Sequence, residues 1–146
     1  MTRKDDFPSP ETRWYHRVSY GETDAMGVVY YANYLHWFEQ ARSHFIREQG
    51  MSYAEIEQRG LLLPVREAYC RYRTPATFDQ EIEVRTGISK WGRASLTFAY
   101  EIINLSRGRI LMSTGHTQHA CIEPSGKMIP VPDWLTALFQ EESEPH

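Results

Sequence analysis

The sequence predicts an α+β fold in which one long central helix is wrapped by a curved antiparallel sheet of about five strands. A length of 146 residues with 41% apolar residues suits one core and leaves little for a second. The apolar pattern changes from a helical stripe in the first third of the chain to two-residue alternation later. A helix with one apolar face needs cover, and an antiparallel sheet with one apolar face supplies it.

The chain begins with residues 1–12, which are polar, contain two prolines and are expected to form a flexible tail. Residues 14–20 are rich in β-forming side chains and predict a first strand, while the glycines and aspartate of residues 21–27 predict a loop. The last residues, 141–146, are again polar and are expected to form a second flexible tail. We therefore expect a single domain over residues 13–140, with no internal repeat or linker.

Residues 29–49 predict the long helix. Of the 19 aromatic residues in the chain, six lie between positions 30 and 45. The apolar stripe has spacings of four, three and four, which is typical of an amphipathic helix. Its members are Tyr34, Phe38, Ala41 and Phe45, and it is widened by Tyr31, Leu35 and Trp37. Gly50 is the type of residue that commonly follows a helix end.

The remaining chain predicts a short helix, further strands and a terminal helix. Ser52 and Glu55 fit a capping box at the start of the short helix, which Gly60 ends. Residues 61–77 contain two prolines and predict a bend or two short strands. The later strands are expected at 80–89, 94–104 and 109–122, with turns at 90–93, 106–108 and 124–127 and a last helix at 133–140. In 80–89, apolar alternation puts Ile82, Val84, Thr86 and Ile88 on one face, and Glu81, Glu83 and Arg85 on the other.

Composition excludes several classes of function. A net charge of −3 and a pI near 6.1 argue against a nucleic-acid-binding domain. The first residues contain no apolar segment typical of a secretory signal. The longest strongly apolar stretch, residues 61–65, is far shorter than a membrane span. The basic residues are 13 Arg and only 3 Lys, which could serve a phosphate-bearing ligand or could be compositional drift.

The cysteines and histidines do not form a metal-binding pattern. Cys70 and Cys121 are far apart in segments that resemble strands, so we expect reduced, buried thiols in a cytoplasmic protein. His116 and His119 are three residues apart in a predicted strand and would face opposite sides. No metal site is expected.

The loop before the long helix holds the candidate chemistry. Asp24 precedes the predicted helix start by a few residues, where unpaired N–H groups and the helix dipole stabilise negative charge on a ligand oxygen. A carboxylate there could act on the same bound group as nucleophile or general base. The alternative is structural: Asp24 as an Asx turn or helix cap, nearby aromatics as core, and Glu39 with Arg42 as a surface helix pair.

Residues 23–34, Thr-Asp-Ala-Met-Gly-Val-Val-Tyr-Tyr-Ala-Asn-Tyr, resemble the signature of the 4-hydroxybenzoyl-CoA thioesterase family, which includes the Tol–Pal-associated acyl-CoA thioesterases. The resemblance covers roughly residues 13–140. Further similar features are Trp37-Phe38-Glu39, Ala41-Arg42, Arg59-Gly60, Thr77-Phe78-Asp79, Ile88-Ser89-Lys90-Trp91 and Ile129-Pro130.

The resemblance implies a hotdog fold and an acyl-CoA thioester hydrolase for short-chain or aromatic acyl groups. It implies that Asp24 is the nucleophile or general base, that the backbone N–H of Tyr31 polarises the thioester carbonyl, and that Gly27 permits a tight turn. It also implies substrate or CoA contacts, for which we nominate Tyr30, Tyr34, Lys90 and Arg93. Coenzyme A is part of the substrate, so no separate cofactor is expected, and the subunits are expected to form homodimers or homotetramers with active sites at the dimer interface.

Two departures from the family pattern affect these expectations. Tyr31 stands where Tol–Pal-type members usually have histidine, which leaves the backbone N–H as the donor at this position. The turn Trp91-Gly92-Arg93-Ala94 has fewer basic residues than the 4-hydroxybenzoyl-CoA enzyme. Two other functions remain open from sequence: a non-catalytic acyl-CoA or acyl-carrier-protein binding module, and a hotdog hydratase.

Overall fold

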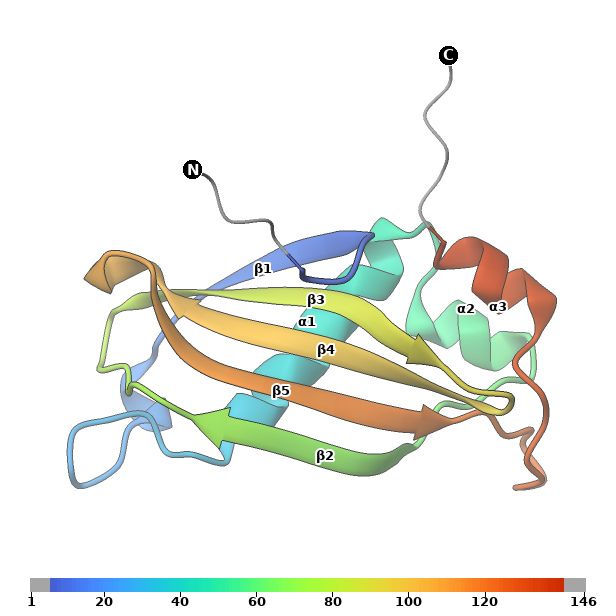
Figure 1. Cartoon of the computed structure of the whole chain (residues 1–146). Helices are drawn as coiled ribbons and strands as arrows, with labels where there is room; N and C mark the ends of the chain where they lie inside the picture. Colours follow the sequence, from blue (N-terminus) through green and yellow to red (C-terminus); the bar gives the residue numbers. More distant parts are fainter. Residues whose placement is uncertain (1–5, 141–146) are drawn as a thin grey trace, which may run out of the picture.

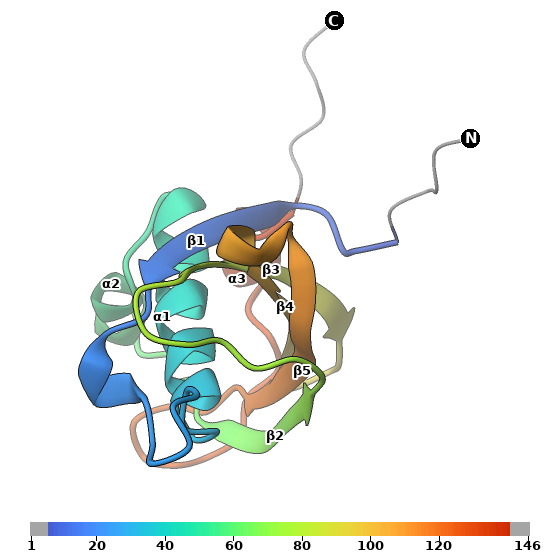
Figure 2. The ribbon, with the colours of Figure 1, turned by 90° about the vertical axis from the view of Figure 1, so that its left-hand side faces the viewer.

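A five-stranded antiparallel sheet wraps one long helix in the computed structural model, which describes residues 6–140 (Figure 1). The strand order is β1-β3-β4-β5-β2, so β1 and β2 form the two edges. Figure 2 views the molecule from one end and shows the sheet curving around α1. The elements are β1 (Glu11–Arg17), η1 (Tyr20–Glu22), α1 (Asn33–Glu48), α2 (Tyr53–Gln58), β2 (Val65–Tyr72), β3 (Glu81–Trp91), β4 (Ser95–Asn104), η2 (Leu105–Arg107), β5 (Ile110–Ala120) and α3 (Asp133–Leu138).

The apolar stripe of α1 packs against the inner face of the sheet, which confirms the predicted core. Phe38 is fully buried and stacks on Tyr100 of β4, with the ring centroids 4.2 Å apart. Gly115 of β5 permits this close approach, because a Cβ atom there would lie only 2.6 Å from the Phe38 ring. The prediction is wrong for two members of the stripe, because Tyr31 and Leu35 are 60% and 42% exposed.

Helix α1 begins four residues later than the sequence predicts. Val29, expected to begin the helix, instead forms an isolated bridge with Thr23, and Val28 just before it forms one with Thr77. The Val29 N–H also donates to the Ala76 carbonyl at 2.9 Å. Thr77 and Ala76 are distant in sequence from residues 28 and 29, so a periodicity argument cannot detect these contacts.

The positions where strands begin and end, and the burial of some strand residues, also differ from the prediction. Strand β1 starts at Glu11, inside the segment expected to be a tail, and β2 is one strand with an irregularity near its start. The rest of the tail predictions, for residues 1–5 and 141–146, lie outside the described residues. Glu83 and Arg85, predicted on the face opposite the apolar residues of this strand, are buried, at 1% and 9% exposed. Arg85 donates to the Glu11 carboxylate at 2.9 Å and to the Glu101 carboxylate at 2.8 Å, so ion pairs compensate its burial.

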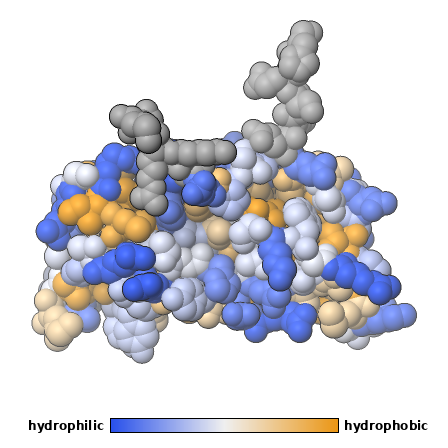
Figure 3. Space-filling view, in the orientation of Figure 1, coloured by the Kyte–Doolittle hydropathy of each residue, from blue (hydrophilic) through white to orange (hydrophobic). Residues whose placement is uncertain are grey.

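The two short helices close one end of the core. Ser52 and Glu55 form the predicted capping box at the start of α2. Helix α3 starts after Pro132 and buries Leu135, and Phe139 just beyond it packs edge-on against Phe45. None of the helices within residues 6–140 is long and apolar enough to cross a membrane. The outer face of the sheet, seen in Figure 3, is largely hydrophilic with separate small apolar areas.

Candidate active site

Asp24 lies in a tight loop between η1 and α1. The Asp24 N–H donates to the Val28 carbonyl, and the Gly27 N–H donates to the Asp24 carbonyl, both at 2.9 Å. Gly27 has a φ of 82°, a conformation that glycine adopts without steric cost. The loop therefore has the tight turn that was expected at Gly27.

The Asp24 carboxylate has one engaged oxygen and one free oxygen. Its Oδ1 accepts a hydrogen bond from the Met26 N–H at 2.8 Å, which is the Asx turn considered as the structural alternative. The other oxygen has no donor among residues 6–140. Since Asp24 also lines a cavity of about 250 Å³, the Asx turn orients the carboxylate without occupying all of it.

The backbone just before α1 supplies an unpaired donor beside this carboxylate. The Tyr30 N–H donates to the Glu22 carbonyl at 2.8 Å, whereas the Tyr31 N–H has no acceptor among the described residues. The N-cap residue Ala32 provides no side-chain cap. Tyr31 lines the same cavity as Asp24. A ligand oxygen in this cavity could accept a hydrogen bond from the Tyr31 N–H, and the positive end of the helix dipole would stabilise negative charge on that oxygen.

Glu22 is a residue that the sequence argument missed, and it organises the loop. Its carboxylate accepts hydrogen bonds from His16 Nε2 and Trp37 Nε1, each at 2.8 Å, and from the Ser19 N–H at 2.7 Å. Burial opposes ionisation of Glu22, but the hydrogen bonds from Ser19, His16 and Trp37 outweigh it and keep its pKa below the usual value. One carboxylate thus joins β1, η1 and α1.

The Glu22 backbone also holds the segment that leads into α1. Its carbonyl accepts the Tyr30 N–H and, at 2.9 Å, the side-chain amide of Asn33. Hydrogen bonds to the one carbonyl of Glu22 therefore hold both a residue just before α1 and the first residue of the helix. The pair Ser19 and Glu22 forms a capping box, a pattern that is readable from the sequence.

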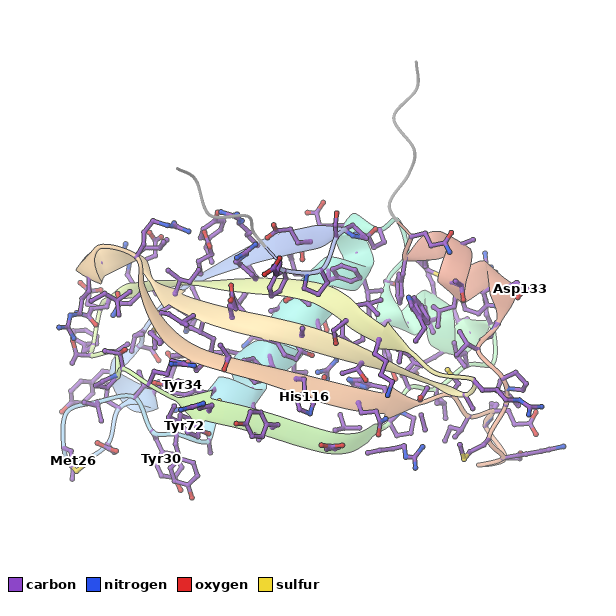
Figure 4. All side chains as sticks on the ribbon, in the orientation of Figure 1. Met26, Tyr30, Tyr34, Tyr72, His116 and Asp133 are labelled. Carbon is purple, nitrogen blue, oxygen red and sulfur yellow. The ribbon has the colours of Figure 1, made fainter. Side chains whose placement is uncertain are left out.

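Tyrosine side chains form much of the cavity wall, at the end of the molecule where Met26, Tyr30, Tyr34 and Tyr72 are labelled in Figure 4. The Tyr72 hydroxyl donates to the Tyr31 carbonyl at 3.0 Å, and Tyr34 packs edge-on against Tyr72. Burial raises the pKa of Tyr34 to about 12 and is also the main cause that raises the pKa of Tyr72, so both hydroxyls stay neutral at ordinary pH.

The predicted binding residues are only partly brought together. Tyr34 is 3% exposed and still contributes to the cavity wall, whereas Tyr30 is 46% exposed, packs against the Tyr31 ring and is not part of that wall. Lys90 and Arg93 lie at the β3–β4 hairpin, at the opposite end of the sheet from the loop that carries Asp24 (Figure 1). Within one chain, they do not reach the Asp24 cavity.

The histidines and cysteines are separated as expected. His116 faces outward near Glu67, while His119 is buried and donates from Nδ1 to the Leu63 carbonyl at 2.8 Å. No group of three potential metal ligands occurs in the described part of the chain. Both cysteines are free: Cys121 is buried as predicted, but Cys70 is only half-buried.

Comparisons with known proteins agree with this architecture. The family model of the thioesterase-like superfamily matches residues 18–139. A putative esterase of Aquifex aeolicus is 34% identical over 125 residues, which cover 86% of this chain and 94% of that protein. The acyl-CoA thioester hydrolase YbgC of Escherichia coli is 32% identical over 131 residues, covering 88% and 96%.

Solved structures show the same likeness. A DHNA-CoA thioesterase from Staphylococcus aureus superimposes with a TM-score of 0.80 at 34% identity, covering 87% of each chain. A hypothetical protein from Aquifex aeolicus gives a TM-score of 0.82 at 29% identity, covering 88% of this chain and 99% of that one. These matches and the helix-in-sheet architecture confirm the hotdog fold. The chain belongs to the thioesterase-like superfamily.

Proposed function

We propose that this protein hydrolyses acyl-CoA thioesters to a free acid and coenzyme A. The observation that carries the proposal is one cavity that holds both Asp24 and Tyr31. Within residues 6–140, the second Asp24 carboxylate oxygen and the Tyr31 N–H have no hydrogen-bond partner. The Tyr31 N–H would stabilise negative charge on the thioester oxygen. Relatives named as acyl-CoA thioester hydrolases support the same reaction.

Asp24 can act by either of two balanced routes. As a nucleophile, it forms a mixed anhydride and expels the CoA thiolate, and water then cleaves the anhydride to the acid. As a general base, it takes a proton from the water that attacks the thioester carbonyl. In both routes the thiolate gains a proton and leaves as free CoA.

The acyl group is proposed to be short or aromatic. The cavity of about 250 Å³ is small, and Tyr31, Tyr34 and Tyr72 line it beside apolar Val28 and Val29. Flat aromatic groups pack well against tyrosine faces. Similar structures are described as thioesterases for DHNA-CoA and gentisyl-coenzyme A, both with aromatic acyl groups.

We further propose that the active unit is a homodimer joined through the β2 edges. Almost every residue of β2 is exposed, including Val65, Tyr69 and Tyr72 at 49%, 48% and 47%. An uncovered edge strand of this kind favours pairing with a second strand. Two-fold antiparallel pairing would bring Lys90 and Arg93 of the partner subunit to the end of the sheet where Asp24 lies, which supports their assignment to CoA binding. The two free thiols support a cytoplasmic location.

The test is thiol release from a panel of short, branched, long and aromatic acyl-CoAs. Asp24→Asn keeps the side-chain size and the Asx-turn oxygen but removes the charge, so we expect kcat to fall by at least about 100-fold with an unchanged melting temperature. Asp133→Asn, at an exposed site at the other end of the molecule in Figure 4, is the matched control and should keep wild-type rates. Wild-type turnover in Asp24→Asn would refute the proposal.

Two other results would point to a different function. Binding of acyl-CoA without thiol release in the wild-type protein would indicate a carrier or binding module. Addition of water to an enoyl-CoA, measured in the same samples, would indicate a hydratase.

A further inference from the structure

The Tyr31 N–H, on which the proposed reaction depends, belongs to the peptide group between Tyr30 and Tyr31. The carbonyl of this group accepts the Asn33 N–H at 3.0 Å, so the carbonyl points along α1. In a trans peptide the N–H points away from the carbonyl. The Tyr31 N–H therefore points out of the N-terminal end of α1, where Tyr31 and Asp24 line one cavity.

The helix by itself fixes the direction of this N–H only weakly. The first turn of α1 has no side-chain cap at Ala32, and helix ends fray. The carbonyls of Tyr30 and Tyr31 accept from N–H groups three residues further along, at 3.0 and 3.2 Å. Bonds with this spacing have poorer geometry than those of an α-helix. A precise donor at this position needs a further contact.

Tyr72 of β2 makes such a contact from outside the helix. Its hydroxyl donates to the Tyr31 carbonyl at 3.0 Å. The Tyr72 ring packs edge-on against the rings of Tyr34 and Tyr31, with centroids 4.8 and 6.1 Å away. Burial is the main cause that raises the pKa of Tyr72, so the hydroxyl keeps its proton at neutral pH. The sheet thereby holds the first turn of α1 at the end of the molecule where Figure 4 labels Tyr34 and Tyr72.

We infer that Tyr72 is a positioning residue, whose hydroxyl holds the first turn of α1 so that the Tyr31 N–H meets the thioester oxygen. This inference rests on the proposed hydrolysis. Without the hydroxyl, the Tyr31 carbonyl loses its bond to the sheet, and the turn can rotate the N–H away from the cavity. An oriented donor stabilises the charge that develops in the transition state, so its loss affects kcat more than KM.

The contact does not depend on what covers β2 in an assembly. The hydrogen bond joins two residues of one chain, and the Tyr72 ring packs inward on α1. Pairing of two β2 edges would use the backbone groups of the strand, so the same contact is expected in a monomer and in a dimer.

Steady-state kinetics of Tyr72→Phe tests the inference, because this change removes the hydroxyl and keeps the ring. With the best acyl-CoA of the panel, kcat should fall at least about tenfold while KM stays within about twofold. Tyr69→Phe makes the same change at an exposed position of the same strand, outside the cavity wall, and should keep wild-type rates. Both variants should keep the solution mass of the wild type, which separates positioning from assembly.

Two unreactive analogues test the placement of the donor without turnover. S-(3,3,3-trifluoro-2-oxopropyl)-CoA has a ketone that adds water and can present an oxyanion, whereas S-(3,3,3-trifluoropropyl)-CoA lacks that oxygen. In calorimetry, Tyr72→Phe should bind the ketone at least about tenfold more weakly than the wild type does and bind the second analogue within about twofold of it. Tyr69→Phe should bind both as the wild type does.

A measurement on the wild type keeps the test decisive if Tyr72→Phe does not fold. A hydroxyl proton held in a hydrogen bond exchanges slowly with water. The Tyr72 hydroxyl proton should therefore be visible by NMR, with a nuclear Overhauser contact to the Tyr34 amide proton, since both donate to the Tyr31 carbonyl. A hydroxyl proton in fast exchange with water would overturn the inference.

The other outcomes distinguish this inference from the proposed function. If Asp24→Asn loses turnover while Tyr72→Phe keeps the wild-type kcat, only the inference fails. Equal weakening of both analogues in Tyr72→Phe, or a raised KM with unchanged kcat, would assign Tyr72 to packing and also overturn it. If the wild type releases no thiol but Tyr72→Phe selectively loses the ketone, the proposed hydrolysis fails and the placement of the Tyr31 N–H by Tyr72 stands.

Discussion

Replacing Glu22 with glutamine tests whether one carboxylate holds the Asp24 loop to the core. The two Glu22 oxygens accept from His16, Ser19 and Trp37, and Trp37 is fully buried. Glutamine has only one acceptor oxygen, and its NH₂ group must face either the Trp37 N–H or the Ser19 N–H. At least one donor therefore loses its acceptor, and the buried indole cannot turn to water.

The expected cost follows from these contacts. A hydrogen bond to a charged group contributes about 1.5–3 kcal/mol, and an unsatisfied buried donor costs about 1–3 kcal/mol. Since both effects apply to the same few bonds, we expect Glu22→Gln to lower the free energy of unfolding by about 2–4 kcal/mol. With a urea m-value of about 2 kcal/mol/M, the midpoint should fall by roughly 1–2 M.

Urea unfolding followed by tryptophan fluorescence, at pH 7 and equal protein concentration, measures this change. Glu57→Gln, at an exposed position of α2, is the matched control and should stay within about 0.5 kcal/mol of the wild type. If Glu22→Gln also stays within that margin, the hydrogen bonds of Glu22 do not hold the loop, and our account of its role is refuted.

Two further predictions concern pH and assembly. The unfolded chain protonates His119 near its ordinary pKa of 6.5, whereas burial lowers the pKa in the native chain to about 4. The free energy of unfolding should therefore fall by up to about 3 kcal/mol as the pH falls from 6.5 to 4. His119→Gln should lack this part of the pH dependence, and parallel pH profiles of the two proteins would contradict the prediction. Sedimentation equilibrium should show that Tyr69→Lys, at the β2 edge, raises the dimer dissociation constant at least about tenfold, because edge lysines oppose strand pairing. Tyr15→Lys on β1 is equally exposed and should have no effect, and a monomeric wild-type protein would contradict the proposed dimer.

Local patterns were sufficient for much of the fold. The spacing of Tyr34, Phe38, Ala41 and Phe45 predicted the buried face of α1, and the Ser52 capping box predicted the start of α2. Both signals depend on residues within a turn or two of each other. The predicted start of α1 was wrong because Val29 bonds to Ala76, a distant partner that no local pattern records.

The same distinction between local and long-range information applies to the candidate site. The sequence by itself determined a glycine-bounded loop with one carboxylate before a long amphipathic helix, because turn chemistry and helical period are local. Only the tertiary structure decided that the Tyr31 N–H finds no acceptor in the described part of the chain, that Glu22 joins three elements, and that Lys90 and Arg93 lie at the far end of the sheet. It also decided that Arg42 turns inward to Tyr100 rather than outward to Glu39. Hydrogen-bond partners and burial depend on contacts between distant segments, and these exist only once the sheet has closed around the helix.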